Sequence, residues 1–85
     1  MSAVAYDLRN TRGYLVADRS GHVLGRVEAP MYGTAPDVPD ALAVRGGGFL
    51  QRRRHLVPAD AIELIDGSSG VIGLSVDRTQ IRSFL

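Results

Sequence analysis

The sequence predicts an all-β domain, a small and strongly bent sheet or barrel of about six strands that ends in a short C-terminal helix or turn. Two observations lead to this fold class. Short β-type segments recur along the chain, and turn signals containing Gly, Pro, Asp or Ser separate them. With 85 residues and no linker, the chain forms one domain, assigned here to residues 13–85 after an N-terminal extension at residues 1–12.

The first two strands are predicted at residues 13–18 and 22–33, joined in a hairpin whose turn contains Gly21. In the second strand Val23 and Val27 are expected to share one face, and Leu24 breaks the alternation. Gly25 marks a bulge, a bend or a close approach of another backbone. The proline-rich residues 29–40 that follow are expected to end in an exposed loop.

A second hairpin is predicted from residues 41–45 and 49–57, with the three glycines at 46–48 as its turn. In the first of these strands Leu42 and Val44 alternate onto one side. We therefore expect both side chains on a single face of the sheet.

The last third of the chain predicts one helical turn at residues 58–61, a strand at 62–66, a turn at 66–70 and a strand at 71–76. Asp77 and Gln80 have the spacing of a capping box, so residues 78–85 are expected to form a short helix or turn. Apolar residues in this part are expected to face the core: Ile72, Leu74, Val76, Ile81 and Phe84.

Composition limits the function. Ten basic residues against nine acidic ones leave a net charge of +1, so any basic binding surface must be local. The absence of Cys excludes disulfides, thiolate metal sites and a Cys nucleophile. No segment approaches the ~20 apolar residues of a membrane span, and the N-terminal residues do not have the pattern of a secretion signal. We therefore expect a cytoplasmic protein without membrane insertion.

The segment GYLVADRSGHVLGRVEAPMYG resembles the opening of PRC-barrel domains, a family named after the photosynthetic reaction centre H subunit. Such domains begin with a strand, an Asp-x-x-Gly turn and an apolar-Gly-x-Val strand, a pattern matched by Asp18, Gly21, Leu24, Gly25 and Val27. The later LVPADAIELID resembles a second landmark of the family, through Val57, Pro58, Ile62 and Ile65.

The resemblance implies a stand-alone bacterial member of this family with a β-barrel of about six strands. Some relatives are parts of larger proteins, such as the ribosome maturation factor RimM and the membrane-anchored H subunit, and their specific activities do not transfer. What the resemblance implies for this chain is a non-enzymatic module that binds other macromolecules or itself.

The run Arg52, Arg53, Arg54 and His55 is the most basic stretch of the chain. Because side chains alternate along a strand, Arg52 and Arg54 are expected on one face, and Arg53 and His55 on the other. An outward pair would contact phosphates or an acidic partner, or would form cross-strand ion pairs with carboxylates such as Asp40 or Glu63. The cluster therefore does not predict one continuous patch.

The loop at residues 31–38 offers Met31 and Tyr32 among prolines. Exposed Met and Tyr side chains are common in contact surfaces. The alternative is that both simply cover one end of the barrel.

Catalytic and metal-binding patterns are missing from the sequence. The glycines at 46–48 lack the spacing and the Lys of a phosphate-binding loop, and the serines at 68 and 69 lack a nucleophile elbow. A metal site would require folding to bring His22 and His55 together with a carboxylate. We predict no catalytic residue, metal or cofactor.

Together these features predict a non-enzymatic interaction module, with its partner surface at Met31, Tyr32 and the Arg52–His55 run. Self-association as a homodimer is expected because a small bent sheet leaves edge strands that a second copy would cover. The alternative, which the composition does not favour, is an RNA- or ribosome-associated maturation factor that uses Arg52, Arg53 and Arg54.

Overall fold

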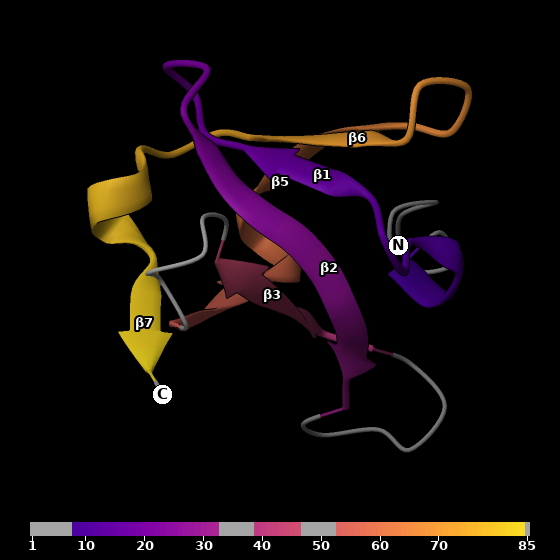
Figure 1. Ribbon diagram of the computed structural model, residues 1–85, viewed down its shortest axis with the longest axis horizontal. Coiled ribbons are helices and arrows are strands. Elements are labelled where there is room, and N and C mark those ends of the chain that lie inside the picture. Colours follow the sequence, from indigo (N-terminus) through magenta and orange to yellow (C-terminus); the bar gives the residue numbers. More distant parts are fainter. Residues whose placement is uncertain (1–7, 33–38, 47–52, 85) are drawn as a thin grey trace.

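The computed structural model describes residues 8–32, 39–46 and 53–84, which form one mixed, strongly bent sheet of seven strands (Figure 1). The all-β prediction is confirmed, with one strand more than the approximate count. The strands are β1 (Leu15–Ala17), β2 (Val23–Met31), β3 (Ala41–Gly46), β4 (Arg54–Pro58), β5 (Ile62–Asp66), β6 (Val71–Leu74) and β7 (Arg82–Phe84). Three single 3-10 turns accompany them: η1 (Leu8–Asn10), η2 (Ala59–Ala61) and η3 (Arg78–Gln80).

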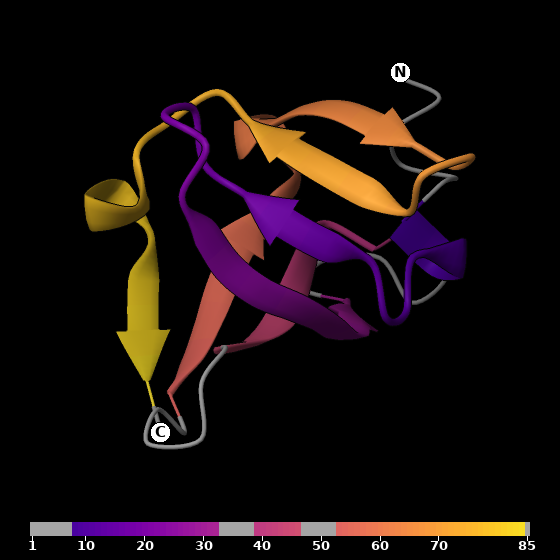
Figure 2. The ribbon, with the colours of Figure 1, turned by 45° about the horizontal axis from the view of Figure 1, so that its top comes forward.

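The strand order is β5-β6-β1-β2-β3-β4-β7. The predicted hairpin β1–β2 is present, β3 and β4 pair antiparallel, and β5–β6 forms a further antiparallel hairpin. Gly46, predicted as part of the turn between β3 and β4, is instead the last residue of β3, and the rest of that turn and the first part of the predicted strand 49–57 fall within residues 47–52, which lie outside the described residues. One pairing is parallel: β1 lies beside β6, with Leu15 opposite Val71. The long strand β2 joins the two halves of the sheet, one made of β5, β6 and β1, the other of β3, β4 and β7 (Figure 2).

A bulge in β2 changes which side chains face the core. Val16 lies opposite Gly25 and Ala17 opposite Val23, so Leu24 is an extra residue on the β2 side. Leu24 is consequently buried, whereas Val23 is half exposed. The expectation that Val23 and Val27 share a face is therefore wrong, because a bulge interrupts strict alternation.

Gly25 lies where the backbone of β2 closely approaches that of β3, opposite Gly46. A Cβ atom at this position would stand 1.8 Å from the carbonyl oxygen of Arg45, and the φ angle of Gly25 is 153°. Only a residue without a side chain permits this approach. Of the three roles that the sequence allows for Gly25, close backbone contact is observed at Gly25 itself, and a bulge is observed at the neighbouring Leu24.

The C-terminal segment differs in part from the prediction. The turn η3 is present, and Gln80 Oε1 accepts a hydrogen bond from the Asp77 backbone N–H at 3.1 Å. Residues 82–84, however, form β7, which pairs with β4 and places Leu56 opposite Arg82. The free edge of β4 supplies backbone partners that a terminal turn would leave unsatisfied.

The core lies inside the bend of the sheet. Leu42 and Val44 are fully buried on one face of β3, as predicted, and Leu8 is fully buried with them. Packing therefore includes η1, which precedes residue 13. The other core residues are Val16, Leu24, Val27, Val57, Ala61, Ile62, Ile72, Leu74 and Ile81.

Within the described ranges, no helix has the length and apolar character needed to cross a membrane.

Candidate functional site

The side of β2, β3 and β4 that faces away from the core, here called the outer face, forms a grid set by strand register. Residues opposite one another in a sheet share a face, and so do alternate residues along a strand. Three rows follow from the pairings: Arg26, Arg45 and Arg54; Ala29, Ala43 and Leu56; Met31, Ala41 and Pro58. A row of arginines therefore crosses three neighbouring strands beside two apolar rows.

Glu28 binds two of these arginines. Its Oε1 lies 3.0 Å from Nε of Arg54, and its Oε2 lies 3.3 Å from Nη2 of Arg54 and 3.3 Å from Nη2 of Arg45. Val27 pairs with Val44 and Ala29 with Ala43, so Glu28 is the extra residue of a second bulge. That bulge directs its carboxylate to the arginine row.

A shallow depression of about 390 Å³ covers the end of the arginine row nearest β1, and Arg12, Arg26, Glu28 and Arg45 line it. Arg26 donates a hydrogen bond from Nη1 to the carbonyl oxygen of Gly13 at 2.9 Å. One carboxylate thus stands among four arginines, counting Arg54, which gives this part of the outer face a net positive charge.

Met31 and Tyr32 are 42% and 45% exposed, at the end of β2. Met31 lies on the outer face, about 13 Å along β3 from the arginine row. The rest of the predicted contact loop, residues 33–38, lies outside the described residues. Of the two roles considered for these side chains, exposure fits a contact surface.

The basic run divides between two faces. Arg54 lies on the outer face, whereas His55 pairs with Val44 on the face that carries the core. Arg53 and His55 line a separate cavity of about 300 Å³. Arg52 lies outside the described residues. The carboxylate that meets Arg54 is Glu28, whereas the sequence pointed to Asp40 or Glu63.

His55 is partly buried, and its Nδ1 atom forms no hydrogen bond within the described part of the chain. Burial lowers the pKa of the imidazole below its ordinary value, and the nearby charge of Arg53 lowers it further. His55 is therefore neutral at pH 7.

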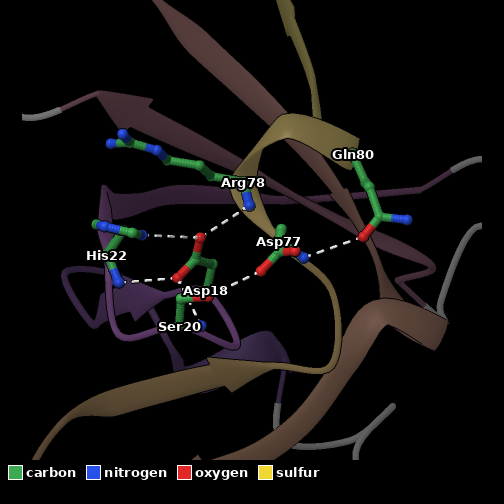
Figure 3. A network of polar contacts seen from close by, with 6 residues as sticks. All are labelled: Asp18, Ser20, His22, Asp77, Arg78 and Gln80. Carbon is green, nitrogen blue, oxygen red and sulfur yellow. Dashed lines mark hydrogen bonds and ion pairs between the residues drawn. The ribbon is translucent and has the colours of Figure 1, made fainter.

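On the η3 side of the cavity that Arg53, His55 and Arg78 line, the buried carboxylate of Asp18 accepts several hydrogen bonds (Figure 3). Asp18 Oδ1 accepts hydrogen bonds from the backbone N–H groups of Ser20, at 3.0 Å, and His22, at 2.8 Å. Its Oδ2 accepts one from the backbone N–H of Arg78 at 2.8 Å. Ser20 Oγ also donates to Asp77 Oδ1 at 2.9 Å. Two polar links thus connect the β1–β2 turn to η3.

Burial alone would raise the pKa of the Asp18 carboxyl. The hydrogen bonds from the backbone of Arg78, His22 and Ser20, with a contribution from the His22 side chain, outweigh burial and lower the pKa below its ordinary value. Asp18 is therefore ionised at neutral pH, where it is a strong acceptor.

The histidines occupy different places. Nδ1 of His22 lies 3.6 Å from Oδ2 of Asp18 beside the first turn, whereas His55 lies on β4. Across the described ranges, no three His, Asp or Glu side chains group closely enough to hold a metal ion. The arrangement offers charged contacts and hydrogen bonds.

Sequence reasoning placed Arg54 and Met31 on a contact surface, and the structure brings them onto one face. It missed Arg26, Arg45 and Glu28, because only strand register brings these three residues to Arg54. No protein-family model matches this chain, and no curated protein matches its sequence.

Proposed function

We propose that this protein is a non-enzymatic interaction module of the PRC-barrel type, which binds an acidic segment of a partner protein on its outer face and associates with a second copy of itself. The observation that supports this most directly is the register of Arg26, Arg45 and Arg54 across adjacent strands. Strands lie about 4.8 Å apart, so the three side chains start within about 10 Å of one another.

Arginine suits such a surface because its planar guanidinium binds carboxylates in a two-pronged geometry. Glu28 already binds Arg54 in this way, with Nε and Nη2 each facing one carboxylate oxygen. It also contacts Arg45, which is still 66% exposed, so the guanidinium is held but accessible. A partner carboxylate would meet side chains that have already lost part of their rotamer freedom.

The apolar rows favour a protein over a nucleic acid as the partner. Leu56 and Ala29, both partly exposed, lie directly beside the arginines on either side of the buried Ala43, and the next row contains the exposed Met31 and Pro58. A surface that combines Arg and Met with apolar area matches the composition of protein interfaces. Phosphodiester backbones offer no apolar side chains for these rows.

Affinity purification of the tagged chain from the cells that encode it, followed by mass spectrometry, tests the proposal. The wild type is compared with the double variant Arg45→Glu and Arg54→Glu and with the matched control Arg19→Glu, which reverses an exposed charge in the β1–β2 turn. We expect the wild type and the control to recover the same protein partner, and the double variant to recover about tenfold less. The purified partner should also bind less tightly as salt increases.

Equal recovery by the double variant would rule out the outer face as the binding surface. A partner that disappears after ribonuclease treatment would support the RNA- or ribosome-associated alternative instead. Exposed ion pairs are worth about 0.2–1 kcal/mol, so the double variant is expected to stay folded, and its thermal unfolding is measured alongside.

A further inference from the structure

The cavity beside His55 lies between the beginnings of β2 and β4 and the turn η3, and its volume is about 300 Å³. Leu24 and Ile81, both nearly fully buried, form its apolar floor, and the half-exposed Val23 borders them. Such a volume is at the lower end of the range for small-molecule sites. It suits a compact ligand.

The polar lining of this cavity is cationic. Arg53 approaches from the start of β4 and Arg78 from η3, and no carboxylate is among the residues that line it. Neither guanidinium forms an ion pair with any residue in the described part of the chain, in contrast to Arg45 and Arg54, which share Glu28. Two like charges at one cavity repel each other, and an anion between them would remove that cost.

His55 and Thr79 complete the polar lining. The charged groups that line the cavity with His55 are Arg53 and Arg78; burial lowers the pKa of the imidazole, and the charge of Arg53 lowers it further. The neutral imidazole of His55 therefore forms a polar part of the cavity wall. The Thr79 side chain adds a hydroxyl donor that carries no charge.

The hydrogen bonds around Asp18 hold the η3 side of the cavity in place. Asp18 accepts the backbone N–H of Arg78, and Asp77, just before it, accepts the hydroxyl of Ser20. In Figure 3 the Arg78 side chain extends away from Asp77 and Gln80, and none of the contacts drawn involves its guanidinium. The backbone of η3 is fixed while this cationic group remains available.

We propose that this cavity binds a phosphate group, either as the free ion or as a small monoester, between the guanidinium groups of Arg53 and Arg78. A phosphate monoester carries close to two negative charges at pH 7, which match two arginines. Its remaining oxygen accepts a hydrogen bond from Thr79, and the organic part of an ester contacts Leu24 and Ile81. This site is separate from the outer face and does not rest on the function proposed for it.

Titration of the ¹⁵N-labelled protein with inorganic phosphate and with phenyl phosphate, at constant ionic strength set with chloride, tests the proposal by NMR. We expect saturable shifts of the backbone amides of Arg53, His55, Arg78 and Thr79. Phenyl phosphate should bind more tightly, because its ring covers the apolar floor.

The variants Arg53→Gln and Arg78→Gln should each weaken phosphate binding about tenfold or more, since each removes a charge-assisted contact. The matched control Arg19→Gln removes an exposed cation from the β1–β2 turn and should leave the affinity unchanged. Shifts that never saturate, or an affinity that both cavity variants leave intact, would overturn the proposal. Because the assay uses small anions and a different set of arginines, its failure would leave the outer-face proposal standing.

Discussion

Oδ2 of Asp18 accepts a hydrogen bond from the backbone N–H of Arg78 at 2.8 Å, although the two residues are 60 positions apart in the sequence. The contact ties the first hairpin to the turn that precedes the last strand. Because Arg78 also lines the cavity beside His55, a structural carboxylate on one element determines where a binding group on another element stands.

Asp18→Asn should lower the free energy of unfolding, and the loss should depend on pH. The folded-state pKa of Asp18 lies below the ordinary value of 3.8, so its ionised form stabilises the fold above that pH. This stabilisation disappears as the pH falls through the lowered pKa. Urea denaturation at pH 7 and pH 3 should therefore show a smaller difference between wild type and variant at pH 3 than at pH 7.

Two comparisons make this result specific to Asp18. Hydrogen bonds from Ser68 lower the pKa of Asp66 too, but Asp66 is present in both proteins and cancels in the difference. Asp77→Asn is the matched control, because Asn caps a turn as well as Asp does, and its effect should be small. A difference between wild type and Asp18→Asn that stays constant with pH would contradict the assignment.

Gly25→Ala should destabilise the protein by about 2–4 kcal/mol, from backbone strain at a positive φ and from overpacking. The new methyl group would overlap the Arg45 carbonyl, so β2 and β3 would have to separate. Gly67→Ala is the control, because its Cβ meets only the Tyr14 hydroxyl at 3.6 Å, an ordinary contact. Urea denaturation of both variants measures the effect, and equal stabilities would show that the strands can move apart without cost.

Arg53→Gln should raise the pKa of His55. The present pKa is lowered by burial and by the charge of Arg53, and the variant removes the second cause while leaving the first. Addition of phosphate to the wild type should raise the same pKa, because the anion offsets the arginine charges. An NMR titration of the imidazole measures both effects, and a pKa of His55 that does not change in the variant would show that Arg53 stands too far away.

The proposed self-association should appear in sedimentation equilibrium as a concentration-dependent mass approaching twice 9.1 kDa. The strand β5 is at one end of the sheet order, and its Leu64 is 58% exposed. A Lys on an edge strand opposes pairing with a second sheet, so Leu64→Lys should favour the monomer. Val23→Lys should not, because Val23, at 50% exposed, lies on an inner strand. A wild type that remains monomeric at millimolar concentration would remove self-association from the proposal.

The turns and the strand faces could be read from the sequence where local chemistry decides them. Gly21 takes a φ of 87° in the predicted hairpin turn, and Gly70 one of 71° in the turn before β6. Leu42 and Val44 alternate onto the buried face as their spacing requires. In these cases a few neighbouring residues contain all the necessary information.

Features that depend on distant pairing could not be read. The bulges at Leu24 and Glu28 exist because of how β1 and β3 align with β2, and each shifts the residues on one side of it to the opposite face from the one that strict alternation gives. Leu8 gives no strand signal, yet it is fully buried. The same holds for the site, since the row of Arg26, Arg45 and Arg54 appears only once the register across three strands is known.

The parallel pairing of β1 with β6 has a consequence for synthesis on the ribosome. The antiparallel pairs β1–β2, β2–β3 and β3–β4 can form as each strand emerges, because the two strands of each pair follow one another in the sequence. The other edge of β1 stays unpaired until β6, at residues 71–74, has been synthesised more than fifty positions later. Until then the nascent chain exposes an unpaired strand edge and an uncovered Val16, so the interval before β6 emerges is when a chaperone would have most to protect.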